Sequence, residues 1–413
     1  MPTTLPLGCD SAGLWNAGAV ETLELELGQP ASGGGNVARL PDGRVAFVRH
    51  GAEGERVRVR LTEERARFVR ADVVEVLVAS PHRVTPPCAF SGAGGCGGCD
   101  YQHLDLAYQR EVKAALLVEQ LDRLANLEAE VVVEPAARPG LANRSRVRFQ
   151  ADGQGRLAMR ASRSHDLVAV ERCALAVEAI DALGLGQQRW PVGCEVEAVA
   201  LEGSAVSLVA EADEDAELPE IAGLTNLQRT QVAGTPFEVD PEGFWQVHRE
   251  APELLTAAVL EAAGELAGAR VLDLYCGAGL FAVAIAARTG AEGSVVGIES
   301  ARRSVNAARR NLKDFPWARV ELSRVDAAAL RRYGEGAQIA VLDPPRAGAG
   351  AKVLEALSST TTLERIVSVS CDAATFARDL RTLLDLGWKL DGLAAFDLFE
   401  FTEHSEQVAL LTR

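Results

Sequence analysis

Residues 271–279 read VLDLYCGAG, and this stretch decides the fold of the C-terminal half of the chain. Its apolar start predicts a buried strand that runs into a Gly-x-Gly turn, formed by Gly277 and Gly279. Glycines at such a turn let the backbone approach a ligand closely, at the carboxyl end of the strand where open α/β sheets bind ligands. The third glycine of the dinucleotide fingerprint would fall at Val283, so the turn disfavours a pyrophosphate ligand.

Strand and helix patterns alternate around this stretch, from about Phe237 onward. Strands that alternate with helices predict a doubly wound parallel sheet, the α/β class. We expect helices at residues 251–266, 281–287 and 302–312, and strands at residues 270–274, 294–298, 339–342 and 365–370.

Acidic residues follow successive strands of this pattern. Glu299 ends one strand, where it is placed to accept hydrogen bonds from ribose hydroxyls, and Asp326 closes the next unit, where it could meet an adenine edge. An acid, a glycine turn and two further acids at strand ends resemble the layout of class I S-adenosylmethionine-dependent methyltransferases. The resemblance implies S-adenosylmethionine as the cofactor, and a generic α/β domain is the alternative.

Two later strand ends carry candidate chemistry. Residues 341–348 read VLDPPRAG, so Asp343 is followed by two prolines that stiffen the loop. Cys371 ends the following strand, on the same edge as the cofactor turn, where a thiol is placed to act as a nucleophile. The alternative is a buried structural cysteine, which is the commoner fate of an isolated cysteine.

A third candidate lies near the C-terminus, where residues 403–411 read EHSEQVALL. This pattern predicts a polar turn that enters a final apolar strand. Glu406 in the turn is the candidate general base. The alternative is a solvated charge.

Together these segments resemble the RNA uracil-C5 methyltransferase family, and the resemblance covers nearly the whole chain. It rests on residues 244–248 (FWQVH), 273–279, 343–348, 370–372 (SCD) and 404–406 (HSE). It implies that Cys371 is the nucleophile, that Glu406 is the proton acceptor, and that the pocket for cofactor and base is lined by Gln246, Tyr275, Glu299, Asp326 and Asp343. Two positions depart from the common pattern: Leu280 beside the cofactor and His248 each replace an Asn.

The chemistry of this family explains the need for a thiol and a base. Uridine C5 is a poor nucleophile, and a thiolate that adds to C6 creates an enolate that makes C5 reactive. After methyl transfer, the base removes the C5 proton and the thiolate is eliminated. Cytosine-C5 enzymes usually place a second cysteine after the Pro of the Asp-x-Pro loop, where this chain has Pro345 and Arg346, so uracil is favoured. A non-catalytic RNA-binding or assembly factor and a small-molecule methyltransferase are the rival classes.

Four of the eight cysteines form a second pattern. Cys88, Cys96, Cys99 and Cys173 are four thiols in a Gly-rich setting, and four thiolates bind either Zn²⁺ or an iron–sulfur cluster. In the family resembled, the branch with an N-terminal small barrel carries a [4Fe–4S] cluster on matching cysteines and largely modifies 23S ribosomal RNA. The transfer-RNA branch generally lacks both features. The cysteines at 9, 194 and 276 have no such partners and are expected to be ordinary thiols.

Three domains are expected along the chain. Residues 18–80 show short strands between turns, which predicts a small barrel of the oligonucleotide-binding type, the TRAM domain of the family, or else a purely structural β-domain. Residues 81–235 form a central α+β domain that carries the cysteines, with a helix at 106–124. Residues 236–413 form the methyltransferase domain.

Charge leaves the partner open. The net charge of −16 argues mildly against RNA, yet residues 138–172 hold eight Arg against three acids, and residues 302–332 hold nine basic residues against three acids. Such stretches are often solvated faces instead. No run of 18 apolar residues and no signal-peptide start are present, so we expect a cytoplasmic protein, and a monomer.

Overall fold

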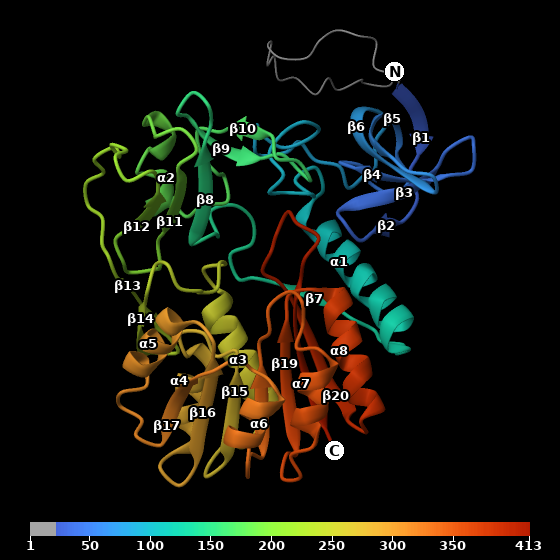
Figure 1. Cartoon of the computed structure of the whole chain (residues 1–413). Helices are drawn as coiled ribbons and strands as arrows, with labels where there is room; N and C mark the ends of the chain where they lie inside the picture. The colour runs from blue at the N-terminus through green and yellow to red at the C-terminus, as the bar shows by residue number, and fades with distance from the viewer. Residues whose placement is uncertain (1–21) are drawn as a thin grey trace.

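The computed structural model describes residues 22–413, so Cys9 and residues 18–21 of the expected barrel domain lie outside the described residues. Figure 1 shows two small β-sheets in the upper half of the molecule and a large sheet, covered by helices on both faces, in the lower half. No helix among residues 22–413 has the length and apolar character needed to cross a membrane.

The large sheet has eight strands in the order β17-β16-β15-β18-β19-β21-β20-β7. Strands β15 to β19 are parallel, as expected. Strand β21 lies between β19 and β20 and is antiparallel to both. The bounds are β7 Val133–Pro135, β15 Arg270–Leu274, β16 Ser294–Glu299, β17 Ala318–Leu322, β18 Ile339–Leu342, β19 Arg365–Ser370, β20 Lys389–Asp397 and β21 Glu406–Thr412.

Helices cover both faces of this sheet because its strands are apolar on both sides. Successive strand residues point to opposite faces, so Val271 joins the core under α3 to α5, whereas Leu272 joins the core under α6 to α8. The bounds are α3 Ala251–Ala263, α4 Leu280–Thr289, α5 Arg302–Asn311, α6 Ala327–Tyr333, α7 Ala351–Ser358 and α8 Ala373–Asp385. The three predicted helices are confirmed to within three residues at each end.

The first upper sheet has the order β1-β5-β6-β4-β3-β2. The backbone of Gly28 and Gln29, which follow β1, pairs with Val37 of β3, so the two edges of the sheet meet and it curls into a small barrel. In β5, Val57 and Val59 are buried in the barrel core, and the arginines that alternate with them point outward. The bounds are β1 Thr22–Glu26, β2 Pro30–Ala31, β3 Gly35–Arg39, β4 Val45–Arg49, β5 Arg56–Glu64 and β6 Phe68–Val78.

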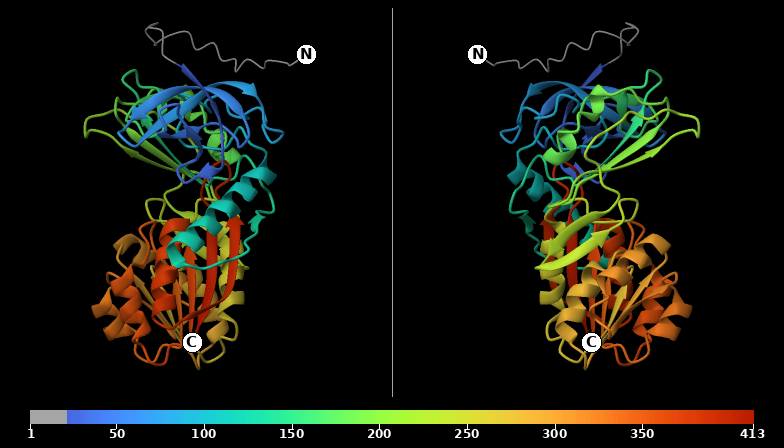
Figure 2. Two further views of the ribbon diagram at one scale, coloured as in Figure 1. Left: turned by 90° about the vertical axis from the view of Figure 1, so that its right-hand side faces the viewer. Right: turned by 90° about the vertical axis from the view of Figure 1, so that its left-hand side faces the viewer.

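The second upper sheet is antiparallel, with the order β10-β9-β8-β11-β12. Helix α1, Leu106–Gln120, confirms the predicted helix and ends in a π turn at Leu121–Ala125. The loop between β20 and β21 rises from the large sheet toward α1 and the upper sheets (Figures 1 and 2). The remaining bounds are β8 Arg146–Ala151, β9 Leu157–Arg160, β10 Leu167–Ala169, α2 Glu178–Asp181, β11 Glu195–Val199, β12 Ser207–Glu211, β13 Gln228–Val232 and β14 Thr235–Val239.

Candidate active site

The glycine turn follows β15 at the carboxyl edge of the large sheet. Gly277 and Gly279 have φ of 53° and 87°, a region that L side chains rarely adopt, and Gly279 precedes α4. A Cβ at Gly279 would lie 3.3 Å from the Cβ of Ala308. Tyr275 also has a positive φ, 64°, which costs about 1–3 kcal/mol for a residue with a side chain. The turn is therefore tight, and Gly277 is its half-buried residue, whereas Cys276, Ala278 and Gly279 are buried.

Three carboxylates gather around this turn. Glu299 accepts hydrogen bonds from the backbone N–H of Gly277 at 3.2 Å and of Ala301 at 2.6 Å, so it ties the glycine turn to the start of α5. Asp273 is fully buried, and the backbone N–H of Ala282 lies close enough to its carboxylate to lower its pKa, although neither oxygen makes a hydrogen bond of normal geometry within residues 22–413. Burial raises the pKa of Asp273 well above its usual range, and the nearby Asp343 and Glu299 raise it further.

This arrangement fits S-adenosylmethionine. A cluster of carboxylates favours a cationic ligand, and the sulfonium and ammonium groups of S-adenosylmethionine are both cationic. Asp273 lies near the carboxyl end of β15, the glycine turn follows it, and Glu299 ends the neighbouring strand β16. Glu299 would hold the ribose hydroxyls there, and the cofactor would supply the methyl group.

The structure brings Gln246 to Asp343, 97 residues along the chain. The Gln246 side-chain amide donates a hydrogen bond to Asp343 Oδ2 at 3.2 Å. Burial raises the pKa of the Asp343 carboxyl to about 7. A carboxyl near its midpoint at neutral pH can either donate to or accept from the edge of a base.

Two other predicted cofactor residues have evident structural roles. Asp326 caps α6, because its Oδ1 accepts from the N–H groups of Ala328 and Ala329 at 2.9 Å each. Leu280 begins α4, and its side chain is buried in the hydrophobic core with Phe281. Leu280 therefore has only its backbone to offer to a cofactor.

Cys371 and Glu406 lie at the ends of neighbouring strands. The register of β19 and β21 pairs Ser370 with Gln407, so the residues that follow and precede them face each other. Burial raises the pKa of the Cys371 thiol to about 12, with a further increase from Glu406 and an opposing decrease from Arg346. Asp343 also raises it, so the structure brings the three predicted catalytic residues together.

Glu406 is only 3% exposed. Burial raises the pKa of its carboxyl well above the usual range, Asp343 raises it further, and Arg346 lowers it. A carboxyl with a high pKa is a strong proton acceptor once it is ionised. The site thus brings together a thiol and a carboxyl, and the Arg346 guanidinium favours the ionised form of both.

Two residues of this site were not assigned a place in it from the sequence. Arg346 entered only the comparison with cytosine-C5 enzymes, and Phe244 only the FWQVH segment. Phe244 is 61% exposed, and a Cβ at Gly277 would lie 3.9 Å from its ring. An exposed aromatic ring at the edge of a site can stack on an unpaired base. The sequence signal for Phe244 was its place in the FWQVH segment, whereas its position beside the glycine turn required the structure.

The four predicted cluster cysteines lie near one another as free, partly buried thiols. Burial raises the pKa of Cys96, and the thiols of Cys173 and Cys88 raise it further, which shows that they are within electrostatic reach. Burial likewise raises the pKa of Cys99 to about 12. As placed, no group of three or more His, Cys, Asp or Glu side chains in residues 22–413 forms a metal site.

The other described cysteines behave as ordinary thiols. Cys194 is buried in the core of the second upper sheet, and Cys276 is buried under the large sheet. Neither is among the groups that surround Cys96 or Cys371.

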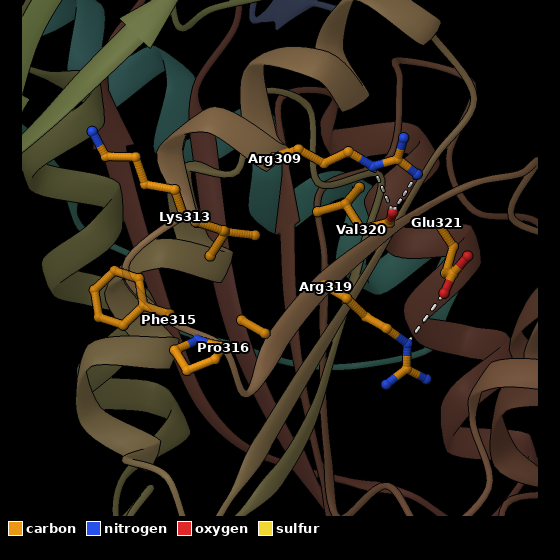
Figure 3. A pocket seen from close by; sticks show the side chains of 9 residues that line it. Arg309, Lys313, Phe315, Pro316, Arg319, Val320 and Glu321 are labelled. Carbon is orange, nitrogen blue, oxygen red and sulfur yellow. Dashed lines mark hydrogen bonds and ion pairs between the residues drawn. The ribbon is translucent and has the colours of Figure 1, made fainter.

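Both basic stretches use many of their arginines in contacts within the chain. On β8, Arg146 and Arg148 pair with Glu197 at 2.9 and 3.3 Å. Beside the edge strand β17, Arg309 donates to the carbonyl of Val320 and Arg319 pairs with Glu321, around a pocket of about 420 Å³ (Figure 3). This pocket shares no residue with the Cys371 site. These pairs reduce the charge available to an RNA backbone.

Comparison with known proteins agrees with this site. A family model described as tRNA (Uracil-5-)-methyltransferase matches residues 236–413, and a TRAM domain model matches residues 19–74. An RNA methyltransferase of Streptomyces coelicolor is 40% identical over 95% of this chain and 93% of its own length. The 23S rRNA (uracil(1939)-C(5))-methyltransferase RlmD of Chromohalobacter salexigens is 32% identical over 94% of this chain and 89% of its own.

The fold agrees as well. The crystal structure of Pyrococcus abyssi tRNA (uracil-54, C5)-methyltransferase, in complex with S-adenosyl-L-homocysteine, superposes with a TM-score of 0.69. The superposition covers 94% of this chain and all of that one, at 21% identity. The glycine turn, the strand-end carboxylates and relatives that span nearly the whole chain lead to one conclusion: the protein belongs to the S-adenosylmethionine-dependent RNA uracil-C5 methyltransferase family.

Proposed function

We propose that this methyltransferase acts on one uridine of 23S ribosomal RNA and that Cys371 forms a covalent adduct with C6 of that base. The observation that carries the proposal is the meeting of Cys371, Glu406 and Asp343 at the strand edge that also holds the glycine turn. The choice of 23S ribosomal RNA is supported by the relative from Chromohalobacter salexigens, whose name states that substrate.

In the proposed reaction, each residue has one task. The Cys371 thiolate forms a bond to C6, and the electron pair of the C5–C6 double bond moves toward the O4 carbonyl. Phe244 and the Gln246–Asp343 pair hold the base while C5 takes the methyl group from S-adenosylmethionine. Glu406 then removes the C5 proton, the double bond re-forms, and the thiolate leaves.

Arg346 favours ionisation of both the Cys371 thiol and the Glu406 carboxyl. The thiol and the Glu406 carboxyl each raise the other's cost of ionisation, because like charges disfavour one another. The Arg346 guanidinium lowers the pKa of both groups against the dominant effect of burial. We propose that Arg346 stabilises the Cys371 thiolate before it attacks.

Mapping of 5-methyluridine in a strain that lacks the protein tests the substrate. We expect one uridine of 23S ribosomal RNA to lose its methyl group, and the wild-type gene to restore it, whereas Cys371→Ala should not. Loss of the modification from transfer RNA instead would favour the tRNA alternative. Full rescue of the strain by Cys371→Ala would favour a non-catalytic assembly factor.

We also propose that Cys88, Cys96, Cys99 and Cys173 hold a [4Fe–4S] cluster, with Zn²⁺ as the alternative. Support comes from the donor set: four free thiols within electrostatic reach of one another, with Arg144 lowering the pKa of Cys96, Cys99 and Cys173 against burial. Their side chains would turn toward the cluster as it binds.

Anaerobic purification tests this second proposal. The protein should contain iron and sulfide in equal amounts and show the broad visible absorption of an iron–sulfur cluster. Cys96→Ser should lose both, and the control Cys194→Ser should keep them. A colourless protein that contains zinc would reject the iron–sulfur assignment.

We also propose that the protein is a monomer and that it acts in the cytoplasm, where ribosomes are assembled.

A further inference from the structure

The loop that connects β20 to β21 ends directly at Glu406. Acidic residues recur in it at every third position, at Asp397, Glu400 and Glu403, before the base itself. Each of these three carboxylates contacts a different part of the chain. The loop is therefore held from several sides just before the residue that abstracts the proton.

Asp397 ties the start of the loop to α1. Its carboxylate pairs with the Lys113 ammonium, and the two side chains are 1% and 0% exposed. Lys113 Nζ also donates to the carbonyl of Phe399 at 3.0 Å. A buried pair with an additional hydrogen bond holds its geometry closely, because each charge lacks water as a substitute partner.

Glu400 ties the middle of the loop to the segment that carries Gln246. Glu400 Oε1 lies 3.5 Å from His248 Nε2, and its Oε2 accepts from Asn143 Nδ2 at 2.6 Å. The N–H of Glu250 donates to His248 Nδ1 at 3.1 Å, so the hydrogen of a neutral His248 is on Nε2, facing Glu400.

Glu403 ties the end of the loop to the barrel. Its Oε2 accepts from the N–H groups of Gly33 and Gly34, which lie in the turn between β2 and β3. Both glycines have positive φ, 102° and 73°, so their N–H groups form an anion-binding nest. A Cβ at Gly34 would lie 2.6 Å from Asp100 Cγ, so a larger residue would displace this turn.

The residues after Cys99 hold the same stretch. The N–H groups of Asp100 and Tyr101 both donate to the carbonyl of Phe401, at 2.7 and 2.9 Å. Phe401 N–H donates in turn to Gln109 Oε1 at 2.8 Å. The barrel and the cysteine loop therefore both contact residues 401–403, shortly before the base.

We infer that Glu403 is a positioning residue for Glu406. The hydrogen bonds that Gly33 and Gly34 of the barrel donate to Glu403 hold the loop, and this contact sets the rate of proton abstraction from C5. The inference rests on the proposed function, in which Glu406 is the base. Cys371 directly follows β19, and β19 is paired with β18 and with residues 407–412 of β21 but not with residues 398–405 of the loop, so the attack on C6 does not require the Glu403 contact. Loosening the loop slows only the last step, and the methylated protein–RNA adduct accumulates.

Single-turnover reactions on the full-length holoenzyme test the inference, with ribosomal RNA from a strain that lacks this protein. In Glu403→Ala, methyl transfer into the adduct should keep its wild-type rate, while release of methylated RNA should slow roughly 10- to 100-fold, the effect expected of a small misplacement of a catalytic group. Glu403→Gln keeps an acceptor for the two N–H groups and should restore most of the release rate.

Two further variants complete the design. Gly34→Ala disturbs the same contact from the barrel side and should give the same adduct if Glu403→Ala does not fold. Glu335 is an exposed acid in the turn that follows α6, and Glu335→Ala is the matched control that should behave as wild type. Glu406→Gln, run in parallel, reports on the base itself.

The outcomes are distinct. Adduct accumulation in Glu406→Gln but in neither Glu403→Ala nor Gly34→Ala would overturn the inference and leave the proposed function intact. Equal losses of RNA binding, methyl transfer and release in both loop variants would also overturn it, because that is the result of a purely structural contact. No adduct in Glu406→Gln would reject Glu406 as the base and would overturn the inference that rests on it, whereas the Cys371 adduct is tested separately by the 5-fluorouridine trap.

Discussion

At the scale of single residues, the site is built from groups that resist ionisation. A thiol whose pKa is about 12 is almost entirely protonated at neutral pH, and Glu406 and Asp343 are likewise shifted toward their neutral forms. The ligand-free site therefore holds little negative charge on these three residues. Arg346 is the group that shifts this balance toward the thiolate.

Alkylation of Cys371 measures this property. In the free enzyme we expect iodoacetamide to label Cys371 slowly at pH 7, and the rate to rise about tenfold per pH unit up to pH 10, because only the thiolate reacts. Arg346→Gln should lower the rate at every pH. Mass spectrometry of the labelled peptide gives the rates, and a plateau below pH 9 would contradict the raised pKa.

Asp343 gives the chain a second pH dependence. Its pKa is raised from 3.8 to about 7, so the folded state disfavours the charged carboxylate. Stability from this group is complete below pH 4 and is lost as the pH rises through about 7. Between pH 5 and pH 8 the Tm of the wild type should fall relative to that of Asp343→Asn, which cannot ionise. Parallel Tm curves would exclude the shift.

At the scale of elements, the strands with chemistry at their ends were the easiest to predict. Strands β15, β18 and β19 begin and end at the predicted residues, because each is a short apolar run that stops at a polar side chain. Strands β17 and β20 and helices α6 to α8 were not predicted. The antiparallel insertion of β21 depends on pairing with β19 and β20, which local sequence does not encode.

The sequence around Asp326 is compatible with two roles, a contact to adenine and a helix cap. It was predicted to contact adenine, whereas in the structure it caps α6. The signal for the cap was present in the sequence, since an Asp before a run of alanines is a common helix start.

Two substitutions of Asp326 separate its roles. Asp326→Ala should lower the free energy of unfolding by about 1 kcal/mol through loss of the cap. Asp326→Asn keeps the capping oxygen and should preserve stability. If Asp326 also contacts the cofactor through its charge, calorimetry should show weaker S-adenosylhomocysteine binding in Asp326→Asn. Unchanged affinity in that variant would leave the cap as the role of this residue.

At the scale of the whole molecule, the active site is completed by distant segments. Glu403 and Gly33 are 370 residues apart, and Lys113 and Asp397 are 284 apart. Sequence patterns indicate each segment but not which segments meet, because these contacts are single polar pairs without a repeating pattern. The candidate residues could be named from the sequence, whereas their support by the barrel and α1 required the structure.

Variants of the buried Lys113–Asp397 pair measure how much the contact between α1 and the end of β20 contributes to stability. Lys113→Met leaves a buried, unpaired carboxylate, which should cost about 3–5 kcal/mol of stability. The double variant Lys113→Met/Asp397→Leu removes both charges and should regain most of that loss. Urea unfolding of the two variants provides the comparison, and equal stability of the single variant and the wild type would contradict the burial of this pair.

The central claim is that Cys371 attacks C6 of a uridine in RNA. The most direct measurement is a covalent trap. The enzyme is incubated with S-adenosylmethionine and with 23S ribosomal RNA transcribed with 5-fluorouridine, and the digested protein is then analysed by mass spectrometry. Fluorine at C5 cannot be removed as a proton, so a methylated nucleotide should remain bonded to the peptide that contains Cys371. An enzyme that methylates the ordinary transcript but forms no such adduct, or forms it on another residue, would contradict the account.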